Sequence, residues 1–302
     1  MKMIACIVEP AYDGTRVYDV LRQRLRVSDG CVRRAKQVDG GVRVDGMSVR
    51  VNEKVRAGQT VALAYDAPGL PGSATDMEPE FSAVRMLHVD AGLLVVDKPA
   101  GIVMYPSPGH ARGTLANRVA GWLKARGMAG GLQAVHRLDA GTSGIAVFAR
   151  HSLAKERLQQ QLHTGAFARE YLAVCSGWLE ADAGTIDAPL GKVSTSPNAF
   201  GVVPDGKPAL TRFWVVRRLT APDGSRCSLV RVRLETGRTH QIRIHFSHAG
   251  HPLVGDETYG AASALIARPA LHSHHVALAH PITGARIVAE SPLPPDMQAL
   301  VL

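Results

Sequence analysis

Cysteine is scarce in this chain of 302 residues, which has only four: Cys6, Cys31, Cys175 and Cys227. No two of them form a Cys-x-x-Cys pair, so the sequence argues against a disulfide framework and against a cysteine zinc site. Long apolar runs are also missing, because no window approaches the roughly 18 uninterrupted apolar residues of a membrane-spanning helix. The first residues, MKMIACIVEPAYDG, lack the long apolar core of a secretion signal. We therefore expect a cytoplasmic protein with no membrane partner.

Acidic residues are in deficit, because 26 Asp and Glu face 35 Lys and Arg and leave a formal net charge of +9. The imbalance is largest in residues 1–65, which hold 12 of the Lys and Arg but only 7 of the Asp and Glu. A basic excess concentrated in one region favours a polyanionic partner, and nucleic acid before a membrane surface. The alternative is a soluble basic protein without such a partner.

The composition divides the chain into two parts. Residues 66–82, DAPGLPGSATDMEPEFS, are rich in Pro, Gly and acids without apolar periodicity, so we predict a linker over 66–84. Before it, VYDVLRQRLRV and CVRRAKQV predict two short basic helices, and GGVRVDGMSV predicts a hairpin that turns at Asp45 and Gly46. QTVALAY predicts a closing strand. Residues 1–65 are therefore expected to form a small α+β domain.

The layout of this domain resembles the S4 RNA-binding domain. The resemblance rests on two short basic helices, a Gly-Val-x-Val-x-Gly turn and a late Gly-x-x-Val, although Asp45 stands where that family usually shows Asn. It implies that basic side chains of this domain bind RNA: Arg16, Arg22, Arg24, Arg26, Arg33, Arg34, Lys36 and Arg43. A basic surface on an unrelated α+β domain is the alternative.

Short strand-like runs and a few helices alternate over residues 85–302. LLVV, REYLAVCSGWL and SLVRVRL read as strands, whereas GTLANRVAGWLKARG and HSLAKERLQQQLHTG read as helices, the second ended by Gly165. The pattern predicts an α+β domain built on a mixed, mostly antiparallel sheet. We see no internal repeat and no low-complexity tract.

The segment HRLDAGTSG, residues 136–144, places Asp139 between two strand-like runs with Arg137 two residues away. A cation nearby favours an ionised carboxylate, which can act as nucleophile or base. The alternative is an Asp that only forms a turn. A protein-kinase loop is excluded, because Leu138 separates Arg from Asp and Gly144 stands where Asn is required. A glycosidase would need a second carboxylate as its acid, and the sequence offers no candidate for it near this segment.

The same segment resembles the catalytic loop of the RluA family of RNA pseudouridine synthases. LLVVDKPAGIVMYP, AREYLAV, LETGRTHQIRIHFSHAGHPLVGD and RPALHSHHVALAHPITG resemble further segments of that family. They follow in the family's order and extend the similarity over residues 85 to about 295. Arg169 replaces the usual Lys before the Tyr. The resemblance implies a pseudouridine synthase fold and isomerisation of uridine in RNA, without cofactor or metal.

By this resemblance Asp139 is the catalytic carboxylate, which attacks C1′ of the ribose or removes a ribose proton. Arg137 would enter the vacated base stack or hold a phosphate, Tyr171 would stack on the extruded uracil, and Arg243 would pair with Asp139. The role of Arg169 stays open. Structural alternatives are a buried strand tyrosine for Tyr171 and a surface charge for Arg243.

Several alternatives remain on substrate, partners and activity. We favour large-subunit ribosomal RNA over transfer RNA, because an S4-like domain accompanies such family members, and we expect a monomer. The second function is a non-catalytic RNA-binding or folding protein on the same scaffold. The many histidines, among them His240, His245, His248 and His251, would permit a metal-dependent hydrolase. No HExxH pattern is present, so structural hydrogen bonds or phosphate contacts are expected of them instead.

Overall fold

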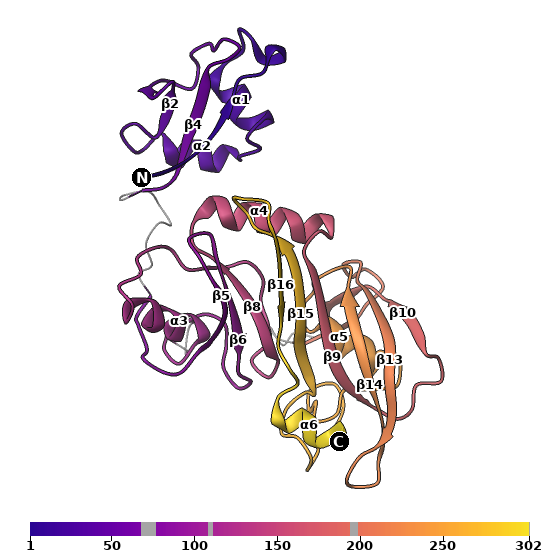
Figure 1. Ribbon diagram of the computed structural model, residues 1–302. Helices are drawn as coiled ribbons and strands as arrows, with labels where there is room; N and C mark the ends of the chain where they lie inside the picture. Colours follow the sequence, from indigo (N-terminus) through magenta and orange to yellow (C-terminus); the bar gives the residue numbers. More distant parts are fainter. Residues whose placement is uncertain (68–76, 108–110, 194–198, 302) are drawn as a thin grey trace.

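The structure is a computed structural model that describes residues 1–67, 77–107, 111–193 and 199–301. Figure 1 shows a small N-terminal module above a larger body built on one long, twisted sheet. The central part of the predicted linker, residues 68–76, lies outside the described residues. None of the helices within the described ranges is long and apolar enough to cross a membrane.

The N-terminal module has a four-stranded sheet in the order β1-β4-β2-β3 and two α-helices that pack on it. Its elements are β1 (Lys2–Ile7), a 3-10 turn (Pro10–Tyr12), α1 (Val17–Gln23), α2 (Asp29–Ala35), β2 (Val42–Val44), β3 (Met47–Ser48) and β4 (Thr60–Asp66). Asp45 and Gly46 both take positive φ, 49° and 83°, which is the conformation that a tight hairpin requires. The predicted helices, hairpin and closing strand are confirmed, whereas the sequence analysis missed β1.

The larger body contains a ten-stranded sheet whose main path runs β10-β13-β14-β9-β15-β8-β6-β5, with β16 and β7 paired at its side. The strands of the main path and its additions are β5 (Arg85–Val89), β6 (Leu93–Lys98), β7 (Gln133–Ala134), β8 (Ser143–Ala149), β9 (Ala168–Ser176), β10 (Ala183–Asp187), β13 (Leu210–Thr220), β14 (Arg226–Leu234), β15 (Leu271–Ala279) and β16 (Arg286–Glu290). Among the described strands, only β8 and β15 pair in parallel. The expected α+β class with a mostly antiparallel sheet is confirmed.

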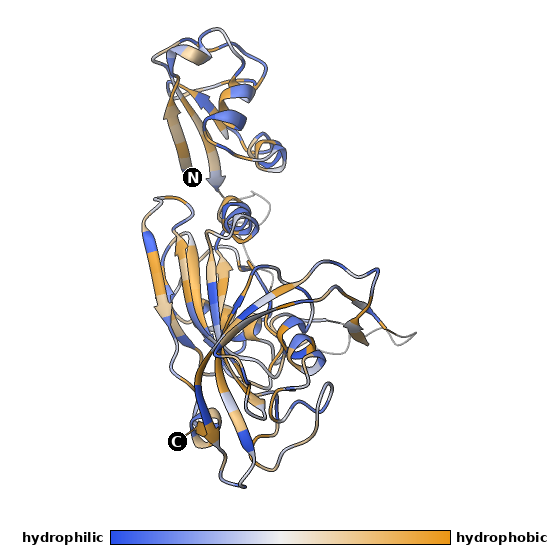
Figure 2. Ribbon diagram, turned by 90° about the vertical axis from the view of Figure 1, so that its right-hand side faces the viewer, coloured by the Kyte–Doolittle hydropathy of each residue, from blue (hydrophilic) through white to orange (hydrophobic). Residues whose placement is uncertain are grey.

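Helices cover parts of this sheet, and a small two-stranded sheet stands beside it. These elements are α3 (Leu115–Lys124), α4 (Ser152–Thr164), α5 (Gln241–His248), α6 (Pro295–Val301), β11 (Leu190–Lys192) and β12 (Phe200–Val202). Apolar residues gather on the strands of the large sheet (Figure 2), and every residue of β8 is buried. Gly165 ends α4 in the left-handed conformation, as the sequence predicts. α5 contacts β12 and β13.

The module rests on α4 (Figure 1). Glu156 accepts hydrogen bonds from the backbone N–H of Ser28 at 2.7 Å and from the Ser28 hydroxyl. Arg157 donates to the carbonyl oxygen of Leu25 at 2.8 Å, and Leu153 is part of the module's apolar cluster. One helix of the larger body therefore fixes the module through polar and apolar contacts.

Candidate active site

The segment 136–144 contains most of the loop between β7 and β8 and the first two residues of β8, which anchor the loop to β15. Gly144 has φ 101°, and a Cβ there would lie 2.2 Å from the carbonyl oxygen of Ser273, so only glycine fits. The neighbouring Ser143 hydroxyl lies 2.9 Å from Nδ1 of His272 on β15. The Ser-Gly end of the motif therefore joins the only parallel strand pair of the described sheet and fixes the loop that carries Asp139.

Lys98, at the end of β6, also fixes this loop through hydrogen bonds of its side chain. Its side chain is 1% exposed, and its Nζ donates to the carbonyl oxygens of Pro99, Ile102 and Ala140 at 3.0, 2.8 and 3.0 Å. Burial lowers the pKa of Lys98 to about 7, although the charge of Asp139 opposes this shift. Sequence reasoning noted the Lys-Pro-Ala-Gly segment without giving Lys98 a role. Its position at the end of an apolar strand is the signal for a buried lysine.

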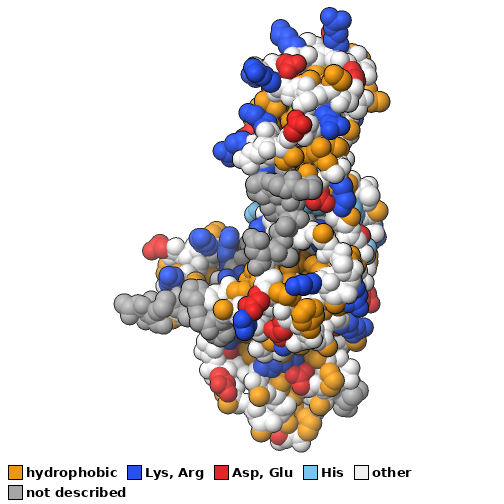
Figure 3. Space-filling view, turned by 90° about the vertical axis from the view of Figure 1, so that its left-hand side faces the viewer, with side chains coloured by type: hydrophobic (Ala, Val, Ile, Leu, Met, Phe, Trp, Pro, Cys, Tyr) orange, Lys and Arg blue, Asp and Glu red, His pale blue; other side chains and the backbone are white. Residues whose placement is uncertain are grey.

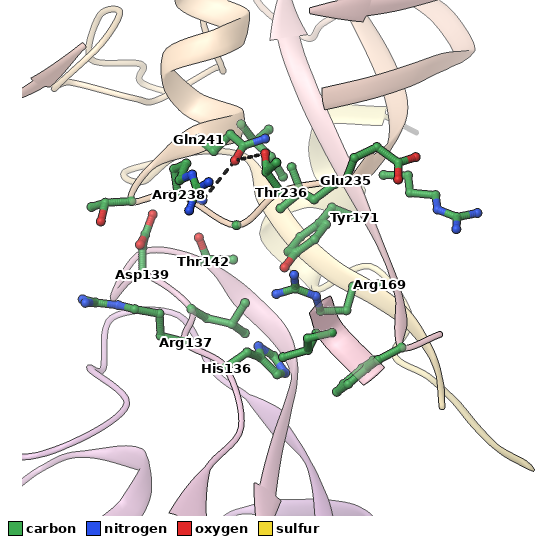
Figure 4. A pocket seen from close by; sticks show the side chains of 18 of the residues that line it. His136, Arg137, Asp139, Thr142, Arg169, Tyr171, Glu235, Thr236, Arg238 and Gln241 are labelled. Atoms are coloured by element: carbon green, nitrogen blue, oxygen red, sulfur yellow. Dashed lines mark hydrogen bonds between the residues drawn. The ribbon is translucent and has the colours of Figure 1, made fainter. Parts of the chain in front are cut away.

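Asp139 opens into a cavity of about 550 Å³. Figure 4 shows Asp139 and Thr142 on one side and the turn with Thr236, Arg238 and Gln241 across from them. The cavity is lined by the loop, α4, β9, β14 and the start of α5; its polar side chains include Arg137, Gln159, His163, Arg169, Arg233, Glu235, Arg238, His240 and Arg243. Arginines outnumber carboxylates among the side chains around Asp139, so the cavity suits an anionic ligand.

Two side chains of the α5 start face the carboxylate of Asp139. Arg243 Nη1 lies 3.7 Å from Oδ2, and His240 Nε2 lies 3.8 Å from Oδ1. The Asp139 side chain is 21% exposed, so it stays accessible from the cavity. Arg243 therefore lies where the family resemblance implied, within ion-pair distance of Asp139.

The stronger partner of Arg243 is Asp256, to which the sequence analysis gave no role. Arg243 Nε and Nη2 each lie 2.7 Å from an oxygen of Asp256, whose side chain is 0% exposed. Burial alone would lower the pKa of Arg243, but the hydrogen bonds and charge of Asp256 outweigh it and raise that pKa. Asp256 also accepts from the backbone N–H of Thr258 and Tyr259. The arginine is thus fixed from behind while Nη1 faces Asp139.

Tyr171 and Arg137 both line the cavity, but they differ in exposure. Tyr171 belongs to β9, is 4% exposed and packs in the main apolar cluster, with its side chain directed into the cavity (Figure 4). Arg137 is exposed, and within the described part of the chain its side chain has no hydrogen bond or ion pair. Arg169 lies near His136, and burial, helped by Arg169, lowers the pKa of His136 to about 3. His136 is therefore neutral, and its Nε2 accepts from Val147 N–H.

Gln241 is a third residue, after Lys98 and Asp256, that the sequence analysis did not single out for a role. It is buried, and its Oε1 accepts from the Thr236 hydroxyl at 2.9 Å and from Arg238 N–H at 3.0 Å. Its Nε2 donates to the carbonyl oxygen of Leu210 and to the hydroxyl of Thr211, both at 3.0 Å. A side-chain amide with all these bonds satisfied holds the turn 236–240 against β13. This places the residues at the start of α5 over Asp139.

Most of the histidines that raised the metal alternative make structural hydrogen bonds. His245 and His251 bond to the carbonyl oxygens of Ala188 and Ser176, and His272 and His274 both bond to that of Ser291. Within the residues that the structure describes, no group of three or more His, Cys, Asp or Glu side chains could hold a metal ion.

The eight basic residues predicted to bind RNA in the module fall into two groups. Five have partners inside the module: Arg16 with Asp19, Arg22 with Asp29, Arg24 with Glu9, Arg34 with Cys31 and Arg43 with the Gly40 carbonyl. The other three, Arg26, Arg33 and Lys36, are exposed and have no such partner among the described residues. Figure 3 shows Lys and Arg side chains projecting from one face of the module, with acidic groups between them.

Comparison with known proteins identifies the family. Residues 92–248 match the sequence profile of RNA pseudouridylate synthases. The chain is 38% identical to the uncharacterised RNA pseudouridine synthase YhcT of Bacillus subtilis, over 97% of this chain and 95% of that protein. It is also 38% identical to the ribosomal large subunit pseudouridine synthase D of Pseudomonas aeruginosa, over 85% of this chain and 82% of that protein.

A solved structure supports the same conclusion. The human protein RNA pseudouridylate synthase domain containing 1 superposes with a TM-score of 0.58 at 25% identity, covering 73% of this chain and 89% of its own. The profile match and the extent of the sequence matches agree with the resemblance carried by HRLDAGTSG and the segments around it. The chain therefore belongs to the RNA pseudouridylate synthase family.

Proposed function

We propose that this protein isomerises uridine to pseudouridine in large-subunit ribosomal RNA, with Asp139 as its catalytic carboxylate. The observation that carries the proposal is the position of Asp139 in a cation-lined cavity, with Arg243 Nη1 3.7 Å from Oδ2. Relatives named ribosomal large subunit pseudouridine synthase D, from Pseudomonas aeruginosa and Nitrosomonas europaea, are 38% and 36% identical to this chain and support the ribosomal substrate. Transfer RNA is the alternative substrate.

The reaction breaks the N1–C1′ bond of a uridine, joins C5 to C1′, releases the C5 proton and leaves a proton on N1. Substrate and product are isomers, so the balance needs no electron acceptor and no group donor. Asp139 acts on the ribose, either by attack at C1′ or by removal of a ribose proton. Asp256 holds Arg243 with Nη1 toward this carboxylate, so a fixed positive charge faces the group on which either step depends.

The target base must leave its stack before Asp139 can reach the sugar, at a cost of a few kcal/mol. Arg137, exposed and unpaired among the described residues, is free to fill the vacated position or to hold a phosphate. Tyr171 offers a ring in the cavity wall, and base–aromatic stacking is worth about 1–3 kcal/mol. Together these groups offset the cost of extrusion.

The N-terminal module is proposed to bind RNA through Arg26, Arg33 and Lys36. Replacing all three with Gln should lower the slope of log K against log salt by about 2–3, because each lost phosphate contact removes about 0.7–0.9. Filter binding to a ribosomal RNA fragment between low and moderate salt measures this slope. The matched control replaces Arg16 and Arg24, whose charges are already paired within the module, and should change the slope less. An unchanged slope in the triple variant would remove these three residues from the RNA interface.

The activity is tested by tritium release from RNA labelled at uridine C5. The RNA is total cellular RNA from a strain that lacks this gene, separated into ribosomal and transfer RNA. We expect release from the large-subunit ribosomal RNA, because the C5 hydrogen leaves only when C5 has bonded to C1′. Release from transfer RNA alone would make transfer RNA the substrate and leave the proposed reaction unchanged. No release from either pool, with RNA still bound, would make the chain a binding protein on a synthase scaffold.

A further inference from the structure

His240, which precedes the first residue of α5, has an unusual backbone. Its φ is 55°, in the left-handed region that is uncommon for residues other than Gly, with Asn, Asp and His adopting it more often than the rest. Its carbonyl accepts the first hydrogen bond of the helix from Ile244 N–H at 2.9 Å, and the adjacent Gln241 side chain holds the turn. Such a conformation is strained and persists only where the surroundings impose it, often at functional sites.

The imidazole of His240 is held in one place by aromatic neighbours. Nδ1 lies 2.9 Å from the hydroxyl of Tyr259, and the Phe200 and Tyr259 rings meet the imidazole edge-on, with centroids at 6.4 and 5.6 Å. The guanidinium of Arg243 also lies over the Tyr259 ring, with its Cζ 5.0 Å from the centroid of the ring. Tyr259 therefore braces both side chains that face Asp139.

The protonation of this group follows from its surroundings. Burial lowers the pKa of His240, and the charged groups that act on it are Asp139 and Asp256 on one side and Arg243 and Arg137 on the other. Burial likewise raises the pKa of Tyr259, so its hydroxyl keeps its proton. With Nε2 3.8 Å from Oδ1 of Asp139 and Nδ1 2.9 Å from the Tyr259 hydroxyl, we expect the neutral imidazole to carry its proton on Nε2 and to accept from Tyr259 at Nδ1.

We propose that His240, oriented by Tyr259, is a positioning residue that fixes the rotation of the Asp139 carboxylate together with Arg243. The inference rests on the proposed function, in which Asp139 is the catalytic group. The terminal torsion of an Asp side chain is broad, so one partner alone leaves it free to turn. Here the two oxygens face different donors, Nε2 of His240 at 3.8 Å from Oδ1 and Nη1 of Arg243 at 3.7 Å from Oδ2. The carboxylate then meets the ribose in one orientation.

Two substitutions separate this role from a backbone role. His240→Asn suits the left-handed backbone but is too short to reach Asp139, whereas His240→Gln can place an N–H donor near the Nε2 position. We expect His240→Asn to lower kcat about 10–100-fold, by misplacing the carboxylate, with KM and RNA Kd changed less than about twofold. His240→Gln should recover most of that loss. His248→Asn, at the exposed far end of the same helix, is the matched control and should leave kcat unchanged.

Tyr259→Phe tests the brace, because it keeps the ring over Arg243 and removes the hydroxyl. In the double variant, its loss of kcat should not add to that of His240→Asn, because both substitutions remove the same hydrogen-bonded path from Tyr259 through His240 to Asp139. Wild-type kcat in His240→Asn would overturn the proposal. An equal loss in the Asn and Gln variants, or a loss that appears in KM, would also overturn it by assigning His240 to the backbone or to RNA binding.

A second measurement does not depend on turnover. Nitrogen-15 NMR of histidine-labelled protein reports the tautomer of His240, whose signal is identified by its loss in His240→Asn. We expect the Nε2-protonated form. An Nδ1-protonated ring would refute the arrangement, even if no RNA were isomerised. An inactive wild type with the Nε2-protonated ring would contradict only the proposed function.

Discussion

Asp139→Asn is expected to lower the rate of pseudouridine formation by roughly 10³-fold or more, because an amide can neither attack C1′ nor accept a ribose proton. The substitution is isosteric and lies in a loop that is held by the Lys98 side chain at the Ala140 carbonyl and by Gly144 against the Ser273 backbone, so folding should be unchanged. RNA should bind with nearly wild-type affinity, since the module and the cavity arginines remain. Tritium release under single-turnover conditions measures the rate, and filter binding measures the affinity.

The matched control for this variant is Asp182→Asn, which removes an equally charged group whose side chain is 87% exposed. It should turn over as the wild type does. If Asp139→Asn retained more than about a tenth of the wild-type rate, a loss of under about 1.4 kcal/mol, the carboxylate would be a turn-forming residue. The cavity would then need another catalytic group.

Asp256→Asn is the second substitution with a large expected effect. It leaves the guanidinium of Arg243 buried without its bidentate partner, and breaking a buried ion pair typically costs about 3–5 kcal/mol. The nearest remaining anion is Asp139, toward which Arg243 should move. A shift of about 1 Å at the reacting group can cost about 100-fold in rate, so we expect turnover to fall by that order. Urea denaturation measures the stability and tritium release the rate.

Asp296→Asn is the control, because Asp296 also receives two hydrogen bonds from one arginine, Arg268, at 2.7 and 2.9 Å. Its side chain is 42% exposed, so water can replace the lost charge, and the cost should stay below about 1 kcal/mol. Equal losses of stability in the two variants would show that burial does not set the strength of the Arg243–Asp256 pair.

The sequence was sufficient to single out the loop that carries Asp139, because HRLDAGTSG is contiguous and its residue types are restricted by its geometry. Gly144 must be glycine beside Ser273, and Asp45 with Gly46 must turn the hairpin. The segments around this loop also predicted Arg243 opposite Asp139, through family resemblance. The Asp45–Gly46 turn is local, whereas Gly144 beside Ser273 and Arg243 opposite Asp139 are long-range contacts, and the sequence indicated the second only through family resemblance.

The residues around Asp139 that sequence reasoning missed are brought there by tertiary folding. Asp256 lies 117 positions from Asp139 in the chain, and nothing in the segment HPLVGDETYG indicates that its carboxylate accepts hydrogen bonds from Arg243. The role of Lys98 depends on the loop folding over the end of β6. The same holds for the N-terminal module. Its internal ion pairs and hydrogen bonds show which of the eight basic side chains are paired and which are free, and the sequence does not distinguish them.

The seating of the module on α4 has a consequence for how a target is chosen. One part of α4 bonds to the module through Glu156 and Arg157, and a later part lines the cavity through Gln159 and His163. Under the proposed RNA-binding role, the two contact areas are joined by a rigid helix and so are a set length apart. Such an enzyme would select a uridine by its distance from the RNA element that the module binds, and the RNA sequence between the two could vary.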